Sequence, residues 1–205
     1  MLIVLAIIGI ITIIVITSQG AFNKSLLLGN AAYDLALAIR STESYGLGSR
    51  VSTALASNTG YGLSFTAGPS VNTFILFADS YPGVVAANCH GRPVTGVTSP
   101  DAKVGDCVYT ALARQDQLIT TYTLNNGITI SKICAFSGTW TCTPTLSRLD
   151  IVFARPDPTP FMSVNGAYSA ANSRACIMLV SPQGGQRFIA INATGQIDAA
   201  ATTCP

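Results

Sequence analysis

The hydrophobic pattern divides the chain into an apolar segment, an amphipathic continuation and a remainder rich in short apolar runs. Residues 1–16 read MLIVLAIIGIITIIVI, and residues 1–23 carry no charged side chain. From Ala21 onward, apolar residues recur mostly at helical spacings, so we expect one helix to continue in register to about Gly46. Its apolar stripe consists of Phe22, Leu26, Leu28, Ala32, Leu35 and Ile39.

The first 16 residues allow three interpretations: the apolar core of a signal peptide, a plain membrane anchor, or part of a longer helix whose start precedes Met1. A signal-peptide core follows a positively charged stretch, and none is present here. As a helix the segment spans ~24 Å, which is short for the ~30 Å hydrocarbon layer. The amphipathic continuation in register favours the longer helix.

After residue 47 the period changes to short β-rich runs separated by Gly, Pro, Asn and Ser. The predicted strands are Tyr61–Thr66, Thr73–Phe77, Cys107–Ala111, Leu118–Leu124, Ile128–Phe136, Thr139–Thr143, Asp150–Ala154, Ala175–Ser181, Arg187–Asn192 and Gln196–Asp198. Asn125-Asn126-Gly127 and Pro182–Gly185 are predicted hairpin turns. The proline-rich stretches 80–106 and 155–174 are predicted loops.

Six cysteines and no Cys-x-x-Cys pair indicate disulfides in an oxidising compartment rather than a zinc site. The candidates are Cys89, Cys107, Cys134, Cys142, Cys176 and Cys204. Fifteen connectivities are possible. Proximity in the sequence favours Cys134–Cys142 as a hairpin staple, then Cys89–Cys107, then Cys176–Cys204, which would hold the C-terminus.

Composition and motifs give little indication of catalysis. Charged residues make up only 10% of the chain, the net charge is +2, and the Lys and Arg residues are scattered, so we expect no nucleic-acid surface. The single histidine, His90, lies beside Cys89 in a predicted loop, and no Gly-x-Ser-x-Gly motif occurs. We therefore expect no catalytic residue, no cofactor and no metal; a calcium site in the loop Pro100–Asp106 is a weaker alternative.

The segment MLIVLAIIGII resembles the N-terminal helix of type IV pilins and of type II secretion pseudopilins, with Gly9 at the glycine of that helix. The following NAAYDLALAIRSTESYGLGSR is similar to the helix end in the H-type, FimT-like branch. The family's Phe-Thr-Leu-Ile-Glu start and its preceding cleavage site are absent before Met1. We therefore expect this sequence to lack the first residues of the mature helix.

The resemblance implies an α+β, pilin-like fold, with a long N-terminal helix packed on an antiparallel β-sheet domain. Residues 1–20 would form the apolar membrane or filament-core half of the helix, 21–46 the amphipathic half and 47–205 a disulfide-containing head. The filament-core residues would be Leu2, Ile3, Leu5, Ile7, Ile8, Gly9, Ile11, Ile13, Ile14 and Ile16.

The resemblance also implies a structural rather than an enzymatic role, as a major or minor subunit of a type IV pilus-like filament. The implied partners are identical subunits and the inner-membrane assembly machinery. The subunit would lie in the inner membrane before assembly and in the extracellular pilus afterwards. The alternatives are a membrane-anchored extracellular binding or adhesin module and a pseudopilin of a type II secretion system.

Overall fold

The computed structural model describes residues 2–48, 60–79, 105–111, 116–154, 157–201 and 203, with side chains for all of these except residues 2, 14–24 and 157. Cys89, His90 and Cys204 therefore lie outside the described residues. The elements are α1 (Leu2–Leu47), β1 (Gly60–Thr66), β2 (Thr73–Asp79), β3 (Gln117–Thr123), β4 (Thr129–Phe136), β5 (Trp140–Cys142), β6 (Arg148–Ala154), β7 (Asp157–Val164), β8 (Ala167–Tyr168), β9 (Arg174–Val180), β10 (Gln186–Asn192) and β11 (Ile197–Ala201).

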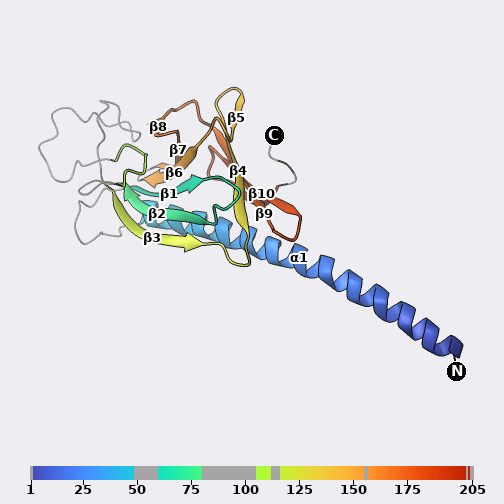
Figure 1. Cartoon of the computed structure of the whole chain (residues 1–205). Helices are drawn as coiled ribbons and strands as arrows, with labels where there is room; N and C mark the ends of the chain where they lie inside the picture. Colours follow the sequence, from blue (N-terminus) through green and yellow to red (C-terminus); the bar gives the residue numbers. More distant parts are fainter. Residues whose placement is uncertain are drawn as a thin grey trace, which may run out of the picture.

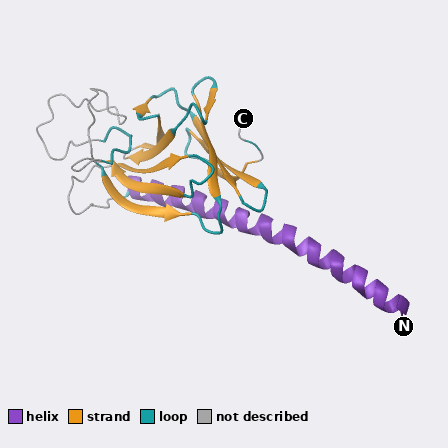
Figure 2. Cartoon of the chain, in the orientation of Figure 1, coloured by secondary structure: helices purple, strands orange, loops and turns teal. Residues whose placement is uncertain are grey.

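The strands form two antiparallel sheets, which lie along the same end of α1 (Figure 1). The larger sheet has the order β3-β2-β1-β6-β7-β8, and the smaller has the order β11-β10-β9-β4-β5. Helix α1 contacts β1 and β6 of the larger sheet and β10 and β11 of the smaller. The opposite end of the helix projects away from the strands (Figure 2).

The predicted fold class, an α+β, pilin-like fold with a long N-terminal helix packed on an antiparallel β-sheet domain, is wrong. The described domain is mostly β and has two sheets, of six and five strands. Only the helix residues from Ser25 to Leu47 include buried side chains among those described, and Ile3–Ile13 are exposed throughout. The resemblance in the first residues therefore did not predict how the rest of the chain is layered.

The helix contributes one buried face to a core shared by both sheets. Leu35 and Ile39 are fully buried, and Leu28 and Ala32 are nearly so. The predicted stripe is therefore correct at these four positions, but Leu26 is half exposed and lies on another face. Additional buried alanines, Ala31, Ala36 and Ala38, let the strands approach the helix closely. The side chain of Phe22 is outside the described residues.

Most predicted strands are confirmed to within two residues at their starts, and two predictions fail. The segment Cys107–Ala111 is not a strand, and the predicted loop 155–174 contains β7 and β8. Pro158 and Pro160 argued against a strand at the position of β7, because proline cannot donate a hydrogen bond to a neighbouring strand. The strand tolerates them because its short neighbour β8 pairs only with Ser163 and Val164, which leaves the proline end of β7 at the sheet edge.

The two predicted turns have different outcomes. The Pro182–Gly185 turn joins β9 to β10, which pair as a hairpin. Asn126 and Gly127 adopt positive φ angles of 59° and 70°, as a tight turn requires, but the strands on either side belong to different sheets. The turn therefore carries the chain from the larger sheet to the smaller, and the hairpin prediction is wrong.

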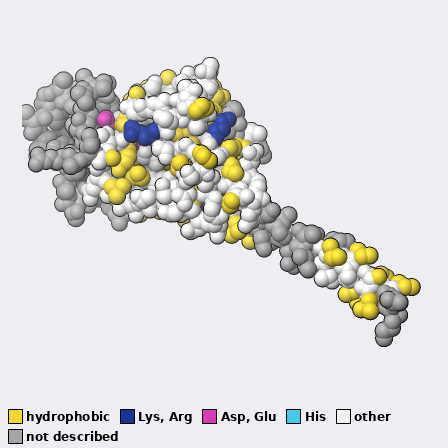
Figure 3. Space-filling view, in the orientation of Figure 1, with side chains coloured by type: hydrophobic (Ala, Val, Ile, Leu, Met, Phe, Trp, Pro, Cys, Tyr) yellow, Lys and Arg dark blue, Asp and Glu magenta, His cyan; other side chains and the backbone are white. Residues whose placement is uncertain are grey.

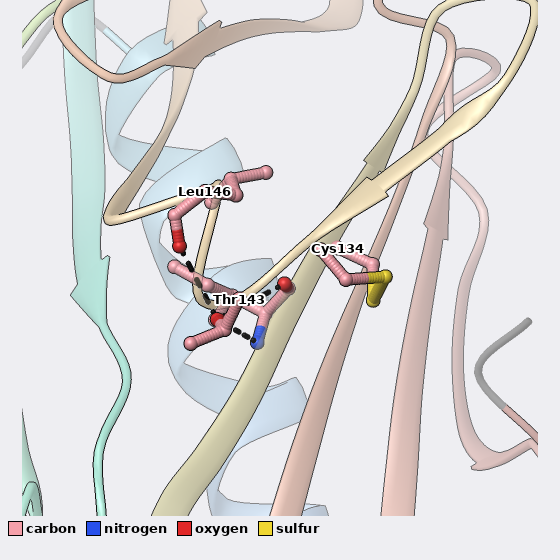
Figure 4. The surroundings of a disulfide bond; sticks show 5 residues. Cys134, Thr143 and Leu146 are labelled. Carbon is pink, nitrogen blue, oxygen red and sulfur yellow. Dashed lines mark hydrogen bonds between the residues drawn. A yellow bond between two sulfur atoms is a disulfide. The ribbon is translucent and has the colours of Figure 1, made fainter.

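The predicted disulfide Cys134–Cys142 is confirmed, and it joins directly opposed residues of β4 and β5. The backbone beyond it is held to β4 as well, because the Thr143 amide donates to the Ile133 carbonyl at 3.0 Å. The Thr143 hydroxyl also donates to the Leu146 carbonyl at 3.2 Å (Figure 4). No described cysteine has a free thiol. The predicted pairs Cys89–Cys107 and Cys176–Cys204 each include a cysteine outside the described residues.

Gly46 is the point of closest approach between the helix and β6. A Cβ atom there would lie 2.3 Å from the Phe153 carbonyl oxygen, a backbone atom that cannot rotate away. We expect Gly46→Ala to lower the free energy of unfolding by roughly 1–3 kcal/mol, the usual cost of overpacking a core. Chemical denaturation measures this change.

Gly29→Ala is the matched control, since a Cβ atom at Gly29 would meet nothing within 4 Å. In the same helix this substitution should stabilise the protein by up to about 1 kcal/mol, because alanine is the better helix former. Equal effects of the two substitutions would contradict the close contact between Gly46 and β6.

Candidate functional site

The most unusual surface of the protein is the apolar half of α1. The eight large hydrophobic residues between Ile3 and Ile13 are each 51–76% exposed. In Figure 3 this segment lies beyond the domain, without other described atoms against it. Its one polar side chain, Thr12, donates its hydroxyl to the Ile8 carbonyl at 2.8 Å and so adds little polarity. Water is an unfavourable environment for such a surface.

The predicted filament-core residues coincide with this exposed segment where the structure describes them. Ile3, Leu5, Ile7, Ile8, Gly9, Ile11 and Ile13 are all exposed. The side chains of Leu2, Ile14 and Ile16 lie outside the described residues. Among the described residues, no helix combines the length and hydropathy that a membrane span requires. Burial of these residues in a filament stays a prediction.

A second candidate is a cluster of three carboxylates at one end of the larger sheet. Oxygen atoms of Asp79, Asp106 and Asp116 lie within 4.8 Å of one another. The antiparallel pairing of β2 with β3 sets Ala78 opposite Gln117, which brings the ends of these strands together. Gly105 passes so close to Asp79 that a Cβ atom there would overlap its carboxylate. The segment 105–111 therefore closes over the buried end of β2.

Backbone amides hold each of these carboxylates in place. The Cys107 amide donates to Asp79 at 2.9 Å, and the Thr110 amide donates to Asp116 at 2.8 Å. The Val108 amide donates to Asp106 at 3.0 Å. The cluster is thus built by the loop 105–111 as much as by the strands.

Burial makes negative charge unfavourable in this cluster. Desolvation raises the pKa of Asp79 well above its usual value, and the nearby Asp116 and Asp106 carboxylates raise it further. Desolvation also raises the pKa of Asp106. Three carboxylates this close can keep a proton, or they can offer hard oxygen ligands of the kind that Ca²⁺ and Mg²⁺ prefer.

A further carboxylate, the buried Asp150 on β6, lies under the same loop. Burial raises the pKa of Asp150 to about 6, although the Arg148 guanidinium 3.0 Å away and hydrogen bonds from Ser64 and Tyr109 favour its charged form. Asp106 adds a smaller repulsion. The acidic character of this end of the sheet therefore extends across β2, β6 and the loop.

The sequence did not indicate this cluster. Of the predicted calcium loop Pro100–Asp106, only Gly105 and Asp106 are among the described residues, and only Asp106 belongs to the cluster. Asp79 and Asp116 are separated by 36 residues, and only the pairing of their strands brings them together.

Comparison with known proteins gives no identification. No protein-family model, curated protein or solved structure matches this chain. The function therefore has to be argued from the exposed surfaces and the chemistry of the chain itself.

The buried carboxylates predict that the protein is more stable in mild acid. Asp150 has a folded-state pKa of about 6, above the ordinary value near 4, so its stabilising contribution is complete below about pH 4 and is lost as the pH rises through 6. The full change in the free energy of unfolding is on the order of 3 kcal/mol, of which roughly 1 kcal/mol falls between pH 5 and pH 7. We expect the free energy of unfolding, measured by chemical denaturation, to be larger at pH 5 than at pH 7.

Neutral variants test the origin of this dependence. Asp150→Asn and Asp79→Asn should each reduce the gain in stability between pH 7 and pH 5, because the amide cannot take up the proton. Asp34→Asn controls for the loss of an exposed carboxylate elsewhere in the chain. The explanation fails if both buried-site variants keep the full pH dependence of the unmodified protein.

Proposed function

We propose that this protein is a structural subunit of a type IV pilus-like filament, and that identical copies assemble by burying the apolar half of α1. The observation that carries the proposal is the exposed segment Ile3–Ile13, which has no charge and projects from a folded domain. The domain lies at the other end of the same helix, so it does not cover the apolar segment.

The energetics favour burial of this segment. Each large aliphatic side chain contributes about 1.5–3 kcal/mol when it is removed from water, and eight such residues are exposed. If lipid covers the segment before assembly, that gain is already realised, and helix packing has to replace lipid contacts. Assembly from a membrane would then need dedicated machinery, in keeping with the resemblance of the first residues to pilins.

The competing function is a membrane-anchored extracellular binding or adhesin module, in which the same segment holds a single copy. A pseudopilin of a type II secretion system is the other alternative that the resemblance of the first residues implies. Self-assembly separates the filament functions from the anchored module.

A charge within the apolar segment tests the proposal. We expect Ile8→Lys to reduce the filament fraction at least about tenfold, because burying one unpaired lysine costs more than the 1.4 kcal/mol that a tenfold change represents. Sedimentation of sheared filaments followed by electron microscopy measures the loss. The purified variant should unfold like the unmodified protein, since Ile8 makes no contribution to the domain core.

Leu118→Lys is the matched control, because Leu118 is also half exposed but lies on β3, far along the chain from the helix. It should leave the filament yield unchanged. A full-length protein that forms no filaments in cells and stays monomeric in detergent would refute the proposal and favour the anchored module.

A further inference from the structure

A long groove runs between the domain-bound half of α1 and the edge of the larger sheet. Its helical wall is one stripe of residues at alternating spacings of three and four, namely Leu27, Asn30, Asp34, Leu37 and Ser41. From residue 27 to residue 41 the helix rises about 21 Å. The opposite wall consists of the end of β3 and the turn that follows it, and the groove has a volume of about 520 Å³. This shape suits an elongated ligand.

The floor of this groove is apolar and includes an aromatic platform. Its aliphatic residues are Ala31, Leu35, Ala38, Leu124 and Ile128. The rings of Phe65, Phe74 and Tyr122 form a stack, with centroid distances of 5.4 Å and 4.9 Å between successive rings. Phe65 is fully buried, whereas Tyr122 is half-buried and lines the groove, so the stack ends there. Because the Tyr122 ring is already packed on Phe74, a ligand does not have to order it on binding.

The rim of the groove carries hydrogen-bonding side chains on both walls. They are Asn30, Asp34 and Ser41 on the helix, and Thr123, Asn125 and Asn126 on the opposite wall. The asparagines are exposed, and each amide offers two donor hydrogens and an acceptor oxygen. Among the described lining residues, Asp34 is the only charged one, and none is Lys, Arg or His. The rim therefore suits a ligand with many neutral polar groups.

A second groove, about 660 Å³ in volume, lies on the other side of Leu37 and differs in its charge. Its lining includes Arg40, Arg187 and Asp198. An acidic ligand would find guanidinium partners in this second groove. In the first groove it would meet only the carboxylate of Asp34, which repels it. The contrast favours a ligand without negative charge for the first groove.

A neutral sugar chain has both kinds of surface that the first groove can bind. Its rings have apolar C–H faces, which fit an aromatic platform, and hydroxyl groups at their edges, which fit amide side chains. An aliphatic chain would contact the apolar floor and leave the polar rim unused. We propose that this groove binds a neutral oligosaccharide, with one sugar ring on Tyr122 and hydroxyl groups bonded to Asn30 and Asn125. The site does not depend on filament assembly, because a single anchored copy would carry the same groove.

An array of immobilised oligosaccharides tests the site with the full-length protein held in lipid nanodiscs. The array carries neutral glycans, their sialylated and sulfated counterparts, and uncharged extended peptides. We expect the labelled protein to be retained by neutral glycans, and at least about tenfold less by the acidic counterpart of the same glycan. Retention by no neutral glycan would overturn the inference, and so would equal retention by the acidic counterparts or retention by the peptides alone.

Variants locate the binding site, with calorimetric titration of the best-retained glycan as the measurement. Tyr122→Leu removes the aromatic face and should weaken binding about tenfold. Asn30→Ala removes an exposed amide from a helix, where alanine is well tolerated, and should weaken binding about fivefold. Arg40→Ala in the second groove is the matched control and should leave the affinity unchanged. Unchanged affinity in both Tyr122→Leu and Asn30→Ala would overturn the inference, whether or not the protein forms filaments.

Discussion

Burial of one face of α1 between two sheets is the interaction on which the rest of the structure depends. The helix supplies Leu28, Leu35 and Ile39 to a core whose other residues come from both sheets. Buried side chains of the helix and of both sheets belong to one core cluster, so the helix completes the packing of both sheets. The small side chains of the buried face and the glycine at position 46 bring the strands close enough to complete the packing.

The domain holds only one half of the helix. Over Ser25–Leu47, α1 contacts strands of both sheets. The Arg187 guanidinium on β10 donates to the Ser25 hydroxyl at 3.2 Å, where the helix leaves the domain. The exposed residues Ile3–Ile13 belong to the same helix but add nothing to the buried core.

The sequence predicted the elements better than their arrangement. Periodicity predicted the end of the helix near Gly46, and the helix ends at Leu47. This prediction succeeded because the apolar face of a helix and the glycine that follows it can both be recognised from neighbouring residues. The sequence did not predict the division of the strands into two sheets. The tight turn at Asn126 is compatible both with a hairpin and with two strands that belong to different sheets. The cluster of Asp79 and Asp116 was equally hidden, since it arises from strand pairing between residues distant in the sequence.

The two halves of the helix obey opposite requirements, and this difference explains their compositions. The domain half carries the exposed charged side chains Asp34 and Arg40 beside the exposed apolar residues Tyr33 and Leu37. The segment Ile3–Ile13 carries no charge, so water is an unfavourable environment for its surface. The hollows on either side of Leu37 have a different composition, because Asp34 lines one of them, and Arg40, Arg187 and Asp198 line the other. Burial among neighbouring copies, as proposed above, would remove the apolar segment from water.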